Sequence, residues 1–513
     1  MPLRSCAVLM LMFCLAWGRA AARDAGAGPS LVVAHHVRHV VVEPDGTYLL
    51  TVDDERTLVG PRRARDDARF TLRASRTLDA IVSVQAYTQK PDGRRVPVLP
   101  GSIQSHDDDA ARATTIAFPG AARGDRLIVH YVVRRHTPRL PGQFDDVAVM
   151  PPLVHRDTTL IYDMPPSMPL HADAVGFVPV PGDCPPGRRR YRWRYVDGPN
   201  ARPEADAVSV LDYGRRLVVS TLPDYPALAA AWRTAAAGKA PPSPADAPLA
   251  RRLTAGLPDT SSRVLALADW VRHHVPRGDG EDGAARLDAL LAAIGIAGTP
   301  ALVNGGNAYK LPDAPALGVL DHMIEYVPDL DLFVDPAAAT VNAGDLPPSL
   351  LGKPVLLLKR GTFAMTPVLQ PQQTRVTATI AVGHPQANGS VATTWHARSA
   401  VDAAVDKLTR ERARRLDFVC AAVDAEDETR LRLPQGMRVA ALPGPASVVS
   451  GGLFYRASYS LENDALLVRR RLTFRHGRAT CTPADAVAMR PALERIRRDL
   501  RSRVAVAGSG SLP

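Results

Sequence analysis

The hydrophobic pattern of the chain changes its period partway along, and this change constrains the fold more than any other feature. From Leu31 to about Val219, short apolar runs alternate with polar residues at period two, and turn sequences such as Pro44-Asp45-Gly46 separate them. Alternation of this kind predicts half-buried β-strands. A Pro- and Ala-rich stretch at 240–248 follows, and from Leu249 the apolar residues recur at helical spacing. The sequence therefore predicts a multidomain α+β protein.

The first part reads as an all-β sandwich domain over residues 23–235. The predicted strands include Val37–Val42, Thr47–Val52, Ala80–Tyr87, Thr114–Phe118 and Leu127–Val133. Many short strands divided by turns are typical of a sandwich. Residues Arg188–Tyr195 interleave arginine with aromatic residues, which is also the composition of a nucleic-acid platform. We favour a half-buried strand with the aromatic rings inside and the arginines outside.

The middle and the end of the chain predict two further domains. In 245–365, helices are expected at Ser262–His274 and Asp282–Ile294, followed by strands at Thr299–Val303, Met323–Val327 and Leu332–Val334. This order describes an α+β core. Alternating strands return from Thr374, which predicts a C-terminal β-rich domain over 370–505 that closes with a basic helix at Arg490–Arg503.

The first 22 residues have the order of a secretory signal: a positive charge, the apolar run Cys6–Trp17, and small residues up to Ala22. We expect cleavage after Ala22, export to the periplasm or the medium, and no transmembrane segment in the mature chain. Three cysteines then remain, so at least one thiol is unpaired, and Cys420 with Cys481 is the favoured bridge because both lie in the same late segment.

Charge and histidine spacing give little support for particular ligands. The formal net charge of +11 would draw anionic partners such as lipid headgroups or acidic glycans, but arginine is spread along the whole chain. His35 and His39 share one side of a strand, yet they stand about 13 Å apart at roughly 3.3 Å per residue, too far to share an ion. We therefore predict no metal site and no cofactor, and export argues against nucleic acid as a partner.

The middle segment carries the motif with chemical content. Arg277-Gly-Asp-Gly280-Glu-Asp opens the second predicted helix, Leu320-Asp-His322 opens a strand, and Leu332-Phe-Val-Asp335-Pro336 closes another. These landmarks, in this order, resemble the bacterial transglutaminase-like superfamily, whose papain-like core begins its helix with Asp-Cys-Lys-Asp. Residues from about 30 to 230 resemble the β-rich domain of unknown function that commonly precedes such cores. The resemblance implies a cysteine nucleophile at the helix start, a strand histidine as base and a strand aspartate that orients it.

Carried over residue by residue, the resemblance gives His322 as the base, Asp335 as its partner and Gly280 at the position of the nucleophile. Glycine has no side chain, and no cysteine lies between Cys184 and Cys420, so no covalent acyl intermediate can form there. Glu281 also replaces the family's lysine. We therefore expect an exported, non-catalytic protein that binds or scaffolds a peptide, protein or glycan of the envelope. The alternatives are a transferase, peptidase or hydrolase that uses His322 and Asp335 with a non-cysteine nucleophile, or a binding module centred on the sandwich. His322 and Asp335 could also be remnants without a function, a packed histidine and a turn aspartate.

Overall fold

The computed structural model of the chain describes residues 30–60, 68–107, 111–237, 244–275, 281–338, 341–342, 344–369, 373–381, 399–433, 437–462, 465–502 and 504–508. The predicted leader and Gly280 therefore lie outside the described residues. The chain forms two compact units. The first contains the N-terminal part up to Ala201 with 214–223 and 313–316, and the second contains 202–213, 224–312 and the remainder.

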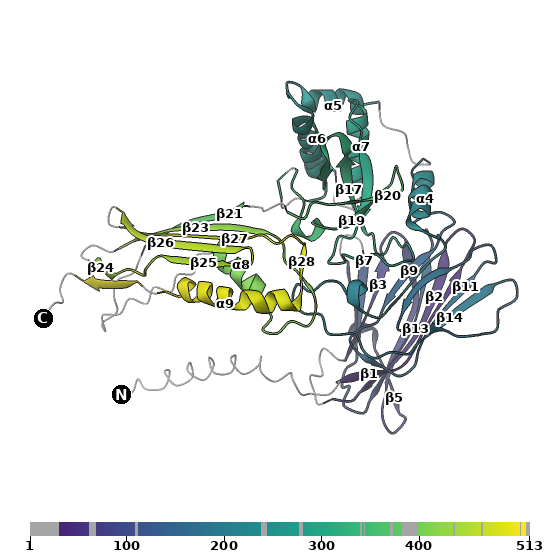
Figure 1. Cartoon of the computed structure of the whole chain (residues 1–513). Helices are drawn as coiled ribbons and strands as arrows, with labels where there is room; N and C mark the ends of the chain where they lie inside the picture. The colour runs from purple at the N-terminus through teal and green to yellow at the C-terminus, as the bar shows by residue number, and fades with distance from the viewer. Residues whose placement is uncertain are drawn as a thin grey trace, which may run out of the picture. The chain divides into compact units, whose positions relative to one another are not determined.

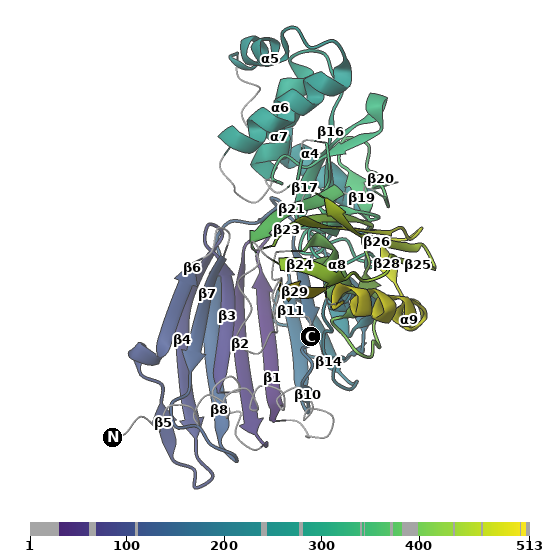
Figure 2. The ribbon, with the colours of Figure 1, turned by 90° about the vertical axis from the view of Figure 1, so that its left-hand side faces the viewer.

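The first unit is built on one large, twisted sheet (Figure 2). Its strands are β1 (Leu31–Val42), β2 (Tyr48–Leu58), β4 (Asp79–Gln89), β5 (Arg95–Pro97), β8 (Arg126–Arg135), β10 (Val154–His155), β11 (Thr158–Met164), β13 (Phe177–Pro179) and β14 (Arg189–Tyr195). They run in the order β13-β14-β11-β1-β2-β8-β4-β5, and β10 also pairs with β1. Most neighbours are antiparallel, whereas β1 lies parallel to β10 and β11.

Two three-stranded sheets complete the first unit. The first has the order β3-β7-β6, formed by β3 (Arg69–Ser75), β7 (Ala111–Ala117) and β6 (Ile103–Asp107). The second has the order β12-β15-β9, formed by β12 (His171–Val175), β15 (Arg216–Ser220) and β9 (Asp145–Val149). Each closes a separate hydrophobic core against the large sheet, one around Phe70 and Val129, the other around Tyr162 and Leu217. The result is β-rich and layered. The five strands predicted in this region coincide with β1, β2, β4, β7 and β8, except that Thr47 and Phe118 lie one residue outside β2 and β7.

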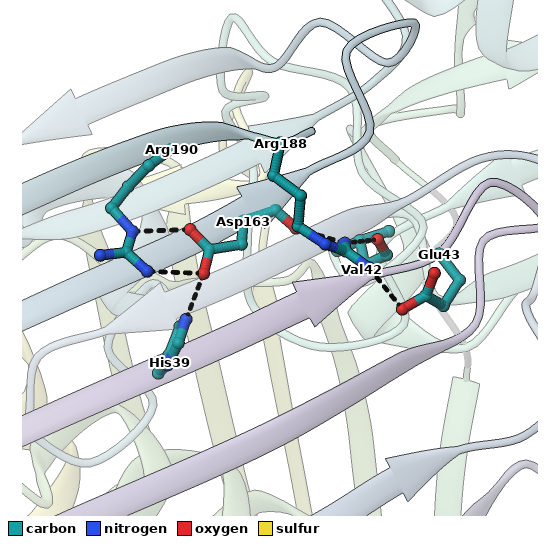
Figure 3. A network of polar contacts seen from close by, with 6 residues as sticks. All are labelled: His39, Val42, Glu43, Asp163, Arg188 and Arg190. Atoms are coloured by element: carbon teal, nitrogen blue, oxygen red, sulfur yellow. Dashed lines mark hydrogen bonds and ion pairs between the residues drawn. The ribbon is translucent and has the colours of Figure 1, made fainter. Parts of the chain in front are cut away.

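A chain of charged contacts ties three neighbouring strands of the large sheet together (Figure 3). Asp163 on β11 accepts two hydrogen bonds from the Arg190 guanidinium on β14, at 2.7 and 2.8 Å, and one from His39 Nε2 on β1 at 2.7 Å. Burial alone would raise the pKa of Asp163, but the bonds from Arg190 and His39 outweigh it and hold the pKa below its usual range. The arginines that follow on β14, Arg192 and Arg194, are exposed, while Trp193 between them is buried.

We predict that replacing Arg190 with methionine destabilises the first unit by about 1–3 kcal/mol at neutral pH, because the buried Asp163 carboxylate loses its bidentate hydrogen-bond donor. A carboxyl group with a lowered pKa contributes stability that is present above its unfolded pKa and lost as the pH falls through the folded pKa. The deficit of Arg190→Met should therefore shrink in acid. Urea unfolding at pH 7 and at about pH 3 measures both effects. Arg192→Met, on the same strand but exposed, is the matched control, and an equal loss in both variants would contradict the assignment.

The second unit contains a five-stranded antiparallel sheet with helices packed on it (Figure 1). The strands are β16 (Thr299–Val303), β17 (His322–Val327), β18 (Leu332–Val334), β19 (Pro354–Leu357) and β20 (Thr362–Met365), in the order β18-β17-β16-β19-β20. The helices of this part are α3 (Val210–Tyr213), α4 (Tyr225–Ala237), α5 (Asp246–Thr254), α6 (Thr260–His274) and α7 (Glu281–Ala292). Apolar residues of α5, α6 and α7 meet Val327 and Val334 in one core, and Ile324 and Phe333 belong to a different core.

The rest of the second unit is a further five-stranded sheet with two helices. The strands β21 (Gln373–Ala381), β23 (Val423–Arg432), β27 (Ala465–Phe474), β26 (Leu453–Glu462) and β25 (Ala446–Ser450) lie in that order, and α8 (Ala400–Thr409) and α9 (Pro483–Leu500) bury their apolar residues against them. Two short pairs are added, β22 (Phe418–Val419) with β28 (Thr480–Cys481) and β24 (Met437–Ala441) with β29 (Ala505–Gly508). Cys420 and Cys481 form a disulfide across the first pair, and Cys184 is free and exposed.

Two boundaries differ from the sequence-based expectation. Helix α9 begins at Pro483 rather than near Arg490, because Thr482 and Asp485 form a reciprocal capping box there, and Pro491 lies inside the helix. The chain also divides into two compact units where three domains were expected, and the first unit does not run to 235. Segment 202–213 belongs to the second unit, where the Asp212 carboxylate accepts hydrogen bonds from the amides of Tyr309 and Lys310.

One fully buried carboxyl group stands out in the sheet of the second unit. Glu325 on β17 is buried, and among the described residues neither of its carboxyl oxygens has a hydrogen-bond partner of normal geometry. A Cβ atom at Gly298 would collide with Glu325 Oε1 and would meet Asp288 Oδ1 at 3.0 Å, so glycine leaves the space that the two acids occupy. Burial, with the charge of Asp288 added, raises the pKa of Glu325 well above its usual value.

We predict that the wild-type protein loses stability as the pH rises above 4.5, the ordinary pKa of glutamate, relative to a Glu325→Gln variant. The folded state keeps the proton on Glu325 over a range in which the unfolded chain has released it, so stability falls by at most about 1.4 kcal/mol per pH unit from this group until the folded pKa is reached. Urea unfolding at several pH values between about 5 and 8 gives the difference. Glu494→Gln on the exposed side of α9 is the control, and parallel curves for wild type and Glu325→Gln would refute the assignment.

Candidate functional site

The structure brings His322 and Asp335 together, as the sequence motif predicts. His322 is the first residue of β17 and Asp335 directly follows β18, and the hairpin between these strands pairs Glu325 with Val334. His322 Nε2 and Asp335 Oδ2 lie 3.0 Å apart. The His322 side chain is 23% exposed, whereas the Asp335 side chain is 3% exposed. A buried carboxylate therefore holds one edge of a partly accessible imidazole.

This contact fixes the chemistry of the ring. A carboxylate only accepts hydrogen bonds, so the bonded nitrogen Nε2 carries the hydrogen, and in the neutral ring the lone pair is on Nδ1. An imidazole oriented in this way can act as a base or as a hydrogen-bond acceptor through Nδ1. The pair is thus arranged as the histidine and orienting acid of a catalytic triad are arranged.

Asp335 is itself held by its surroundings. Its other carboxylate oxygen, Oδ1, accepts a hydrogen bond from the amide of Ala337 at 2.9 Å. Arg272 on α6 donates to the backbone carbonyl of Asp335 at 3.2 Å and to that of Val341 at 2.7 Å. The aspartate is therefore fixed both through its side chain and through its backbone, which leaves little freedom for the imidazole that it binds.

Helix α7 begins beside this pair. A Cβ atom placed on Gly283, in the first turn of α7, would meet Pro336 Cγ at 3.5 Å, so the start of the helix packs against the turn that carries Asp335. Gly280, the predicted position of the missing nucleophile, directly precedes α7 in the sequence and lies outside the described residues. The described part of the site thus consists of the histidine, the aspartate and the first turn of the helix.

Sequence reasoning missed the loop that backs His322. Gly305, two residues after β16, lies so close that a Cβ there would meet His322 Cβ at 3.2 Å, and its amide donates to Asp321 Oδ1 at 2.8 Å. The neighbouring carbonyls of Asn304 and Gly306 accept hydrogen bonds from Lys353 Nζ. No motif marks Lys353, which stands alone before an apolar run, and only its burial in the structure identifies it.

The other histidines considered in the sequence, His35 and His39, belong to the first unit. His35 Nδ1 lies 2.6 Å from Asp157 Oδ2 and His39 Nε2 lies 2.7 Å from Asp163 Oδ2, so each has a carboxylate partner of its own. Within the described part of the chain, one group of three metal-type ligands has its atoms within 4.8 Å of one another: Cys420, His476 and Cys481. Its two sulfur atoms are bonded to each other, so in this state neither is a thiolate that could bind a metal.

No helix among the described residues is both long enough and apolar enough to cross a bilayer. The predicted leader itself lies outside the described residues.

Comparison with known proteins gives one domain match in the sequence and one structural match over nearly the whole chain. Residues 44–201 match DUF3857, a domain of unknown function for which a structure has been solved. No curated protein matches this sequence at a significant level. A crystal structure from Parabacteroides distasonis, described as that of a putative protease, superimposes with a TM-score of 0.72 at 15% identity and covers 93% of this chain and 99% of that chain.

Other solved structures match only in part. An M1 zinc metallopeptidase from Deinococcus radiodurans has a TM-score of 0.22 at 10% identity and covers 38% of this chain and 43% of that chain. Yeast LTA4 hydrolase has a TM-score of 0.24 at 8% identity and covers 50% and 39%. These scores are too low to bear on the fold. The chain therefore contains a DUF3857 domain in its first unit and shares the fold of the Parabacteroides distasonis protein over nearly its whole length.

Proposed function

We propose that this chain is an exported, transglutaminase-like protein that has lost its nucleophile and uses the retained site to bind a peptide-like ligand of the envelope without turning it over. The observation that carries the proposal is the contact between His322 and Asp335 beside the start of α7, with glycine at position 280 where the chemistry requires a thiol. The pair has the geometry of a base and its orienting acid, and no side chain at position 280 can attack an acyl group.

The fold supports this proposal indirectly. An α7 helix packed on an antiparallel sheet, with histidine and aspartate on adjacent strands, is the arrangement expected from the motif resemblance. The Parabacteroides distasonis protein is itself described as a putative protease, a reaction class that uses such a site. At 15% identity this likeness concerns the fold, and the step to a peptide-like ligand rests on the His322 and Asp335 geometry.

Export is the second element of the proposal. The order of charge, apolar run and small residues in 1–22 is that of a cleaved leader. The disulfide between Cys420 and Cys481 is the kind of bond that persists in an oxidising compartment such as the periplasm. A cytosolic protein would keep these two thiols reduced, so both features favour the same location.

A thiol restored at position 280 tests whether the site is intact. We predict that Cys in a Gly280→Cys variant is alkylated by iodoacetamide with an apparent pKa at least one unit below the free value of about 8.5, because a helix start and an oriented imidazole both stabilise a thiolate. Peptide mass spectrometry separates this residue from the native cysteines. Adding Asp335→Asn should move the pKa back toward the free value, since the imidazole loses its orienting partner.

The matched control is Ala292→Cys, an exposed position at the opposite end of the same helix. If the thiols of Gly280→Cys and Ala292→Cys titrate alike, the site has decayed and the proposal fails. A second function, hydrolysis by a water that His322 activates, is favoured by the accessibility of the ring. That function predicts that His322→Ala abolishes a hydrolytic activity of the wild type, whereas a binding protein has no such activity to lose.

A further inference from the structure

Lys353 is the most unusual charged residue near the candidate site. It is fully buried, where Gly352 leads into β19, and its Nζ atom points at the loop after β16. It donates to the carbonyl of Asn304 at 2.7 Å and to that of Gly306, and it lies 4.9 Å from the centre of the Tyr309 ring. No carboxylate among the described residues forms an ion pair with it.

Burying an ammonium group without a carboxylate partner is unfavourable, because the group leaves water and gains only carbonyl dipoles. Burial lowers the pKa of Lys353 to about 8, although the charges of Asp321 and Asp212 act in the opposite direction. A methionine or leucine would fill the same space without this cost. We therefore look for a contribution of Lys353 other than packing. Its hydrogen bonds go to the backbone of the loop after β16.

The loop that Lys353 holds is joined to His322 on its other side. Asn304 is tied down by its side chain, which donates to the Val319 carbonyl at 2.6 Å and accepts from the Ala308 amide at 3.0 Å. Gly305 donates to Asp321, the residue before His322, and a Cβ atom on Gly305 would meet His322 Cβ at the short distance of 3.2 Å. The loop that Lys353 holds is therefore linked to His322 through the preceding residue, Asp321, and packs closely beside His322 Cβ.

We propose that Lys353 is a positioning residue of the candidate site: it clamps the loop Asn304–Gly306 by its backbone carbonyls, and through Gly305 this loop fixes the orientation of His322. The role of the oriented imidazole rests on the proposed function, but the clamp itself does not. Three donors on one flexible side chain suit this task, because a lysine ammonium can bond several convergent carbonyls at once.

Hydrogen exchange on the full chain tests the clamp. In Lys353→Met, measured at pH 7, the peptide covering 303–309 should exchange at least about tenfold faster than in the wild type, and the peptide covering 320–326 should follow, while α6 should be unchanged. Lys359→Met is the matched control. Lys359 is the other lysine next to this sheet, is 46% exposed and binds Asp288, so its loss should leave 303–309 unaffected.

A merely structural role gives a different pattern. General destabilisation would accelerate exchange in α6 as much as in the loop, and this result, or an unchanged loop, would overturn the proposal. Should Lys353→Met fail to fold, Gly305→Ala tests the same chain of contacts, because the added methyl group presses on His322 Cβ from the loop side. Then 320–326 must exchange faster in Gly305→Ala than in the wild type, and an unchanged rate would overturn the proposal.

The thiol of Gly280→Cys separates this inference from the proposed function. In the double variant with Lys353→Met its apparent pKa should rise toward the free value, because the imidazole beside it is no longer held. If Gly280→Cys alone already titrates as a free thiol, the proposed function fails, and the exchange rates still decide whether Lys353 clamps the loop. If the thiol pKa is low and unaffected by Lys353→Met, the positioning role is refuted while the proposed function stands.

Discussion

The register of β17 is the constraint on which the candidate site depends. This strand lies between β16 and β18, and its pairing places His322 opposite Val303 and Glu325 opposite Val334. It is buried on both faces, with Ile324 in one hydrophobic core and Val327 in another. A slip of one residue would exchange the faces of every side chain and force polar groups into both cores, so the register is strongly specified. The contact between His322 and Asp335 follows from that register.

Two buried ionisable groups in and next to this sheet are individually unfavourable, Glu325 and Lys353. Glu325 on β17 lacks partners of normal geometry among the described residues, and Lys353 beside β19 contacts carbonyls in place of carboxylates. Apolar residues of the same size would give a more stable sheet. The large sheet of the first unit differs, since its buried Asp163 is satisfied by Arg190 and His39. Lys353 thus combines an unfavourable burial with hydrogen bonds to the loop next to His322.

Regular elements with a clear period could be predicted from the sequence. The strands Thr299–Val303 and Leu332–Val334 have the predicted bounds, and α6 and α7 lie where the apolar spacing indicates helices. Helix α8 and the start of α9 were not anticipated, because short caps such as Thr482 with Asp485 are weak signals in a polar segment. The grouping of 202–213 with the second unit depends on contacts a hundred residues away, such as those of Asp212, and no local pattern encodes them.

In the candidate site, too, some residues could be predicted from local sequence patterns and others could not. His322 and Asp335 could be predicted because strand order and motif spacing are properties of the sequence. Lys353 could not, because its partners are backbone carbonyls, which every residue carries, and a single lysine beside an apolar run has the ordinary appearance of a strand end.

The proposed function depends on what a histidine and an aspartate can do without a neighbouring thiol. With Nε2 bonded to Asp335, the ring offers a single acceptor at Nδ1, and the carboxylate fixes its direction. A directed acceptor recognises an N–H group such as a peptide amide, whereas a freely rotating imidazole gives up orientational entropy to do so. Under the proposed function, glycine at position 280 would leave the oriented ring as an acceptor with no nucleophile beside it. This is the physical argument for proposing binding in preference to turnover.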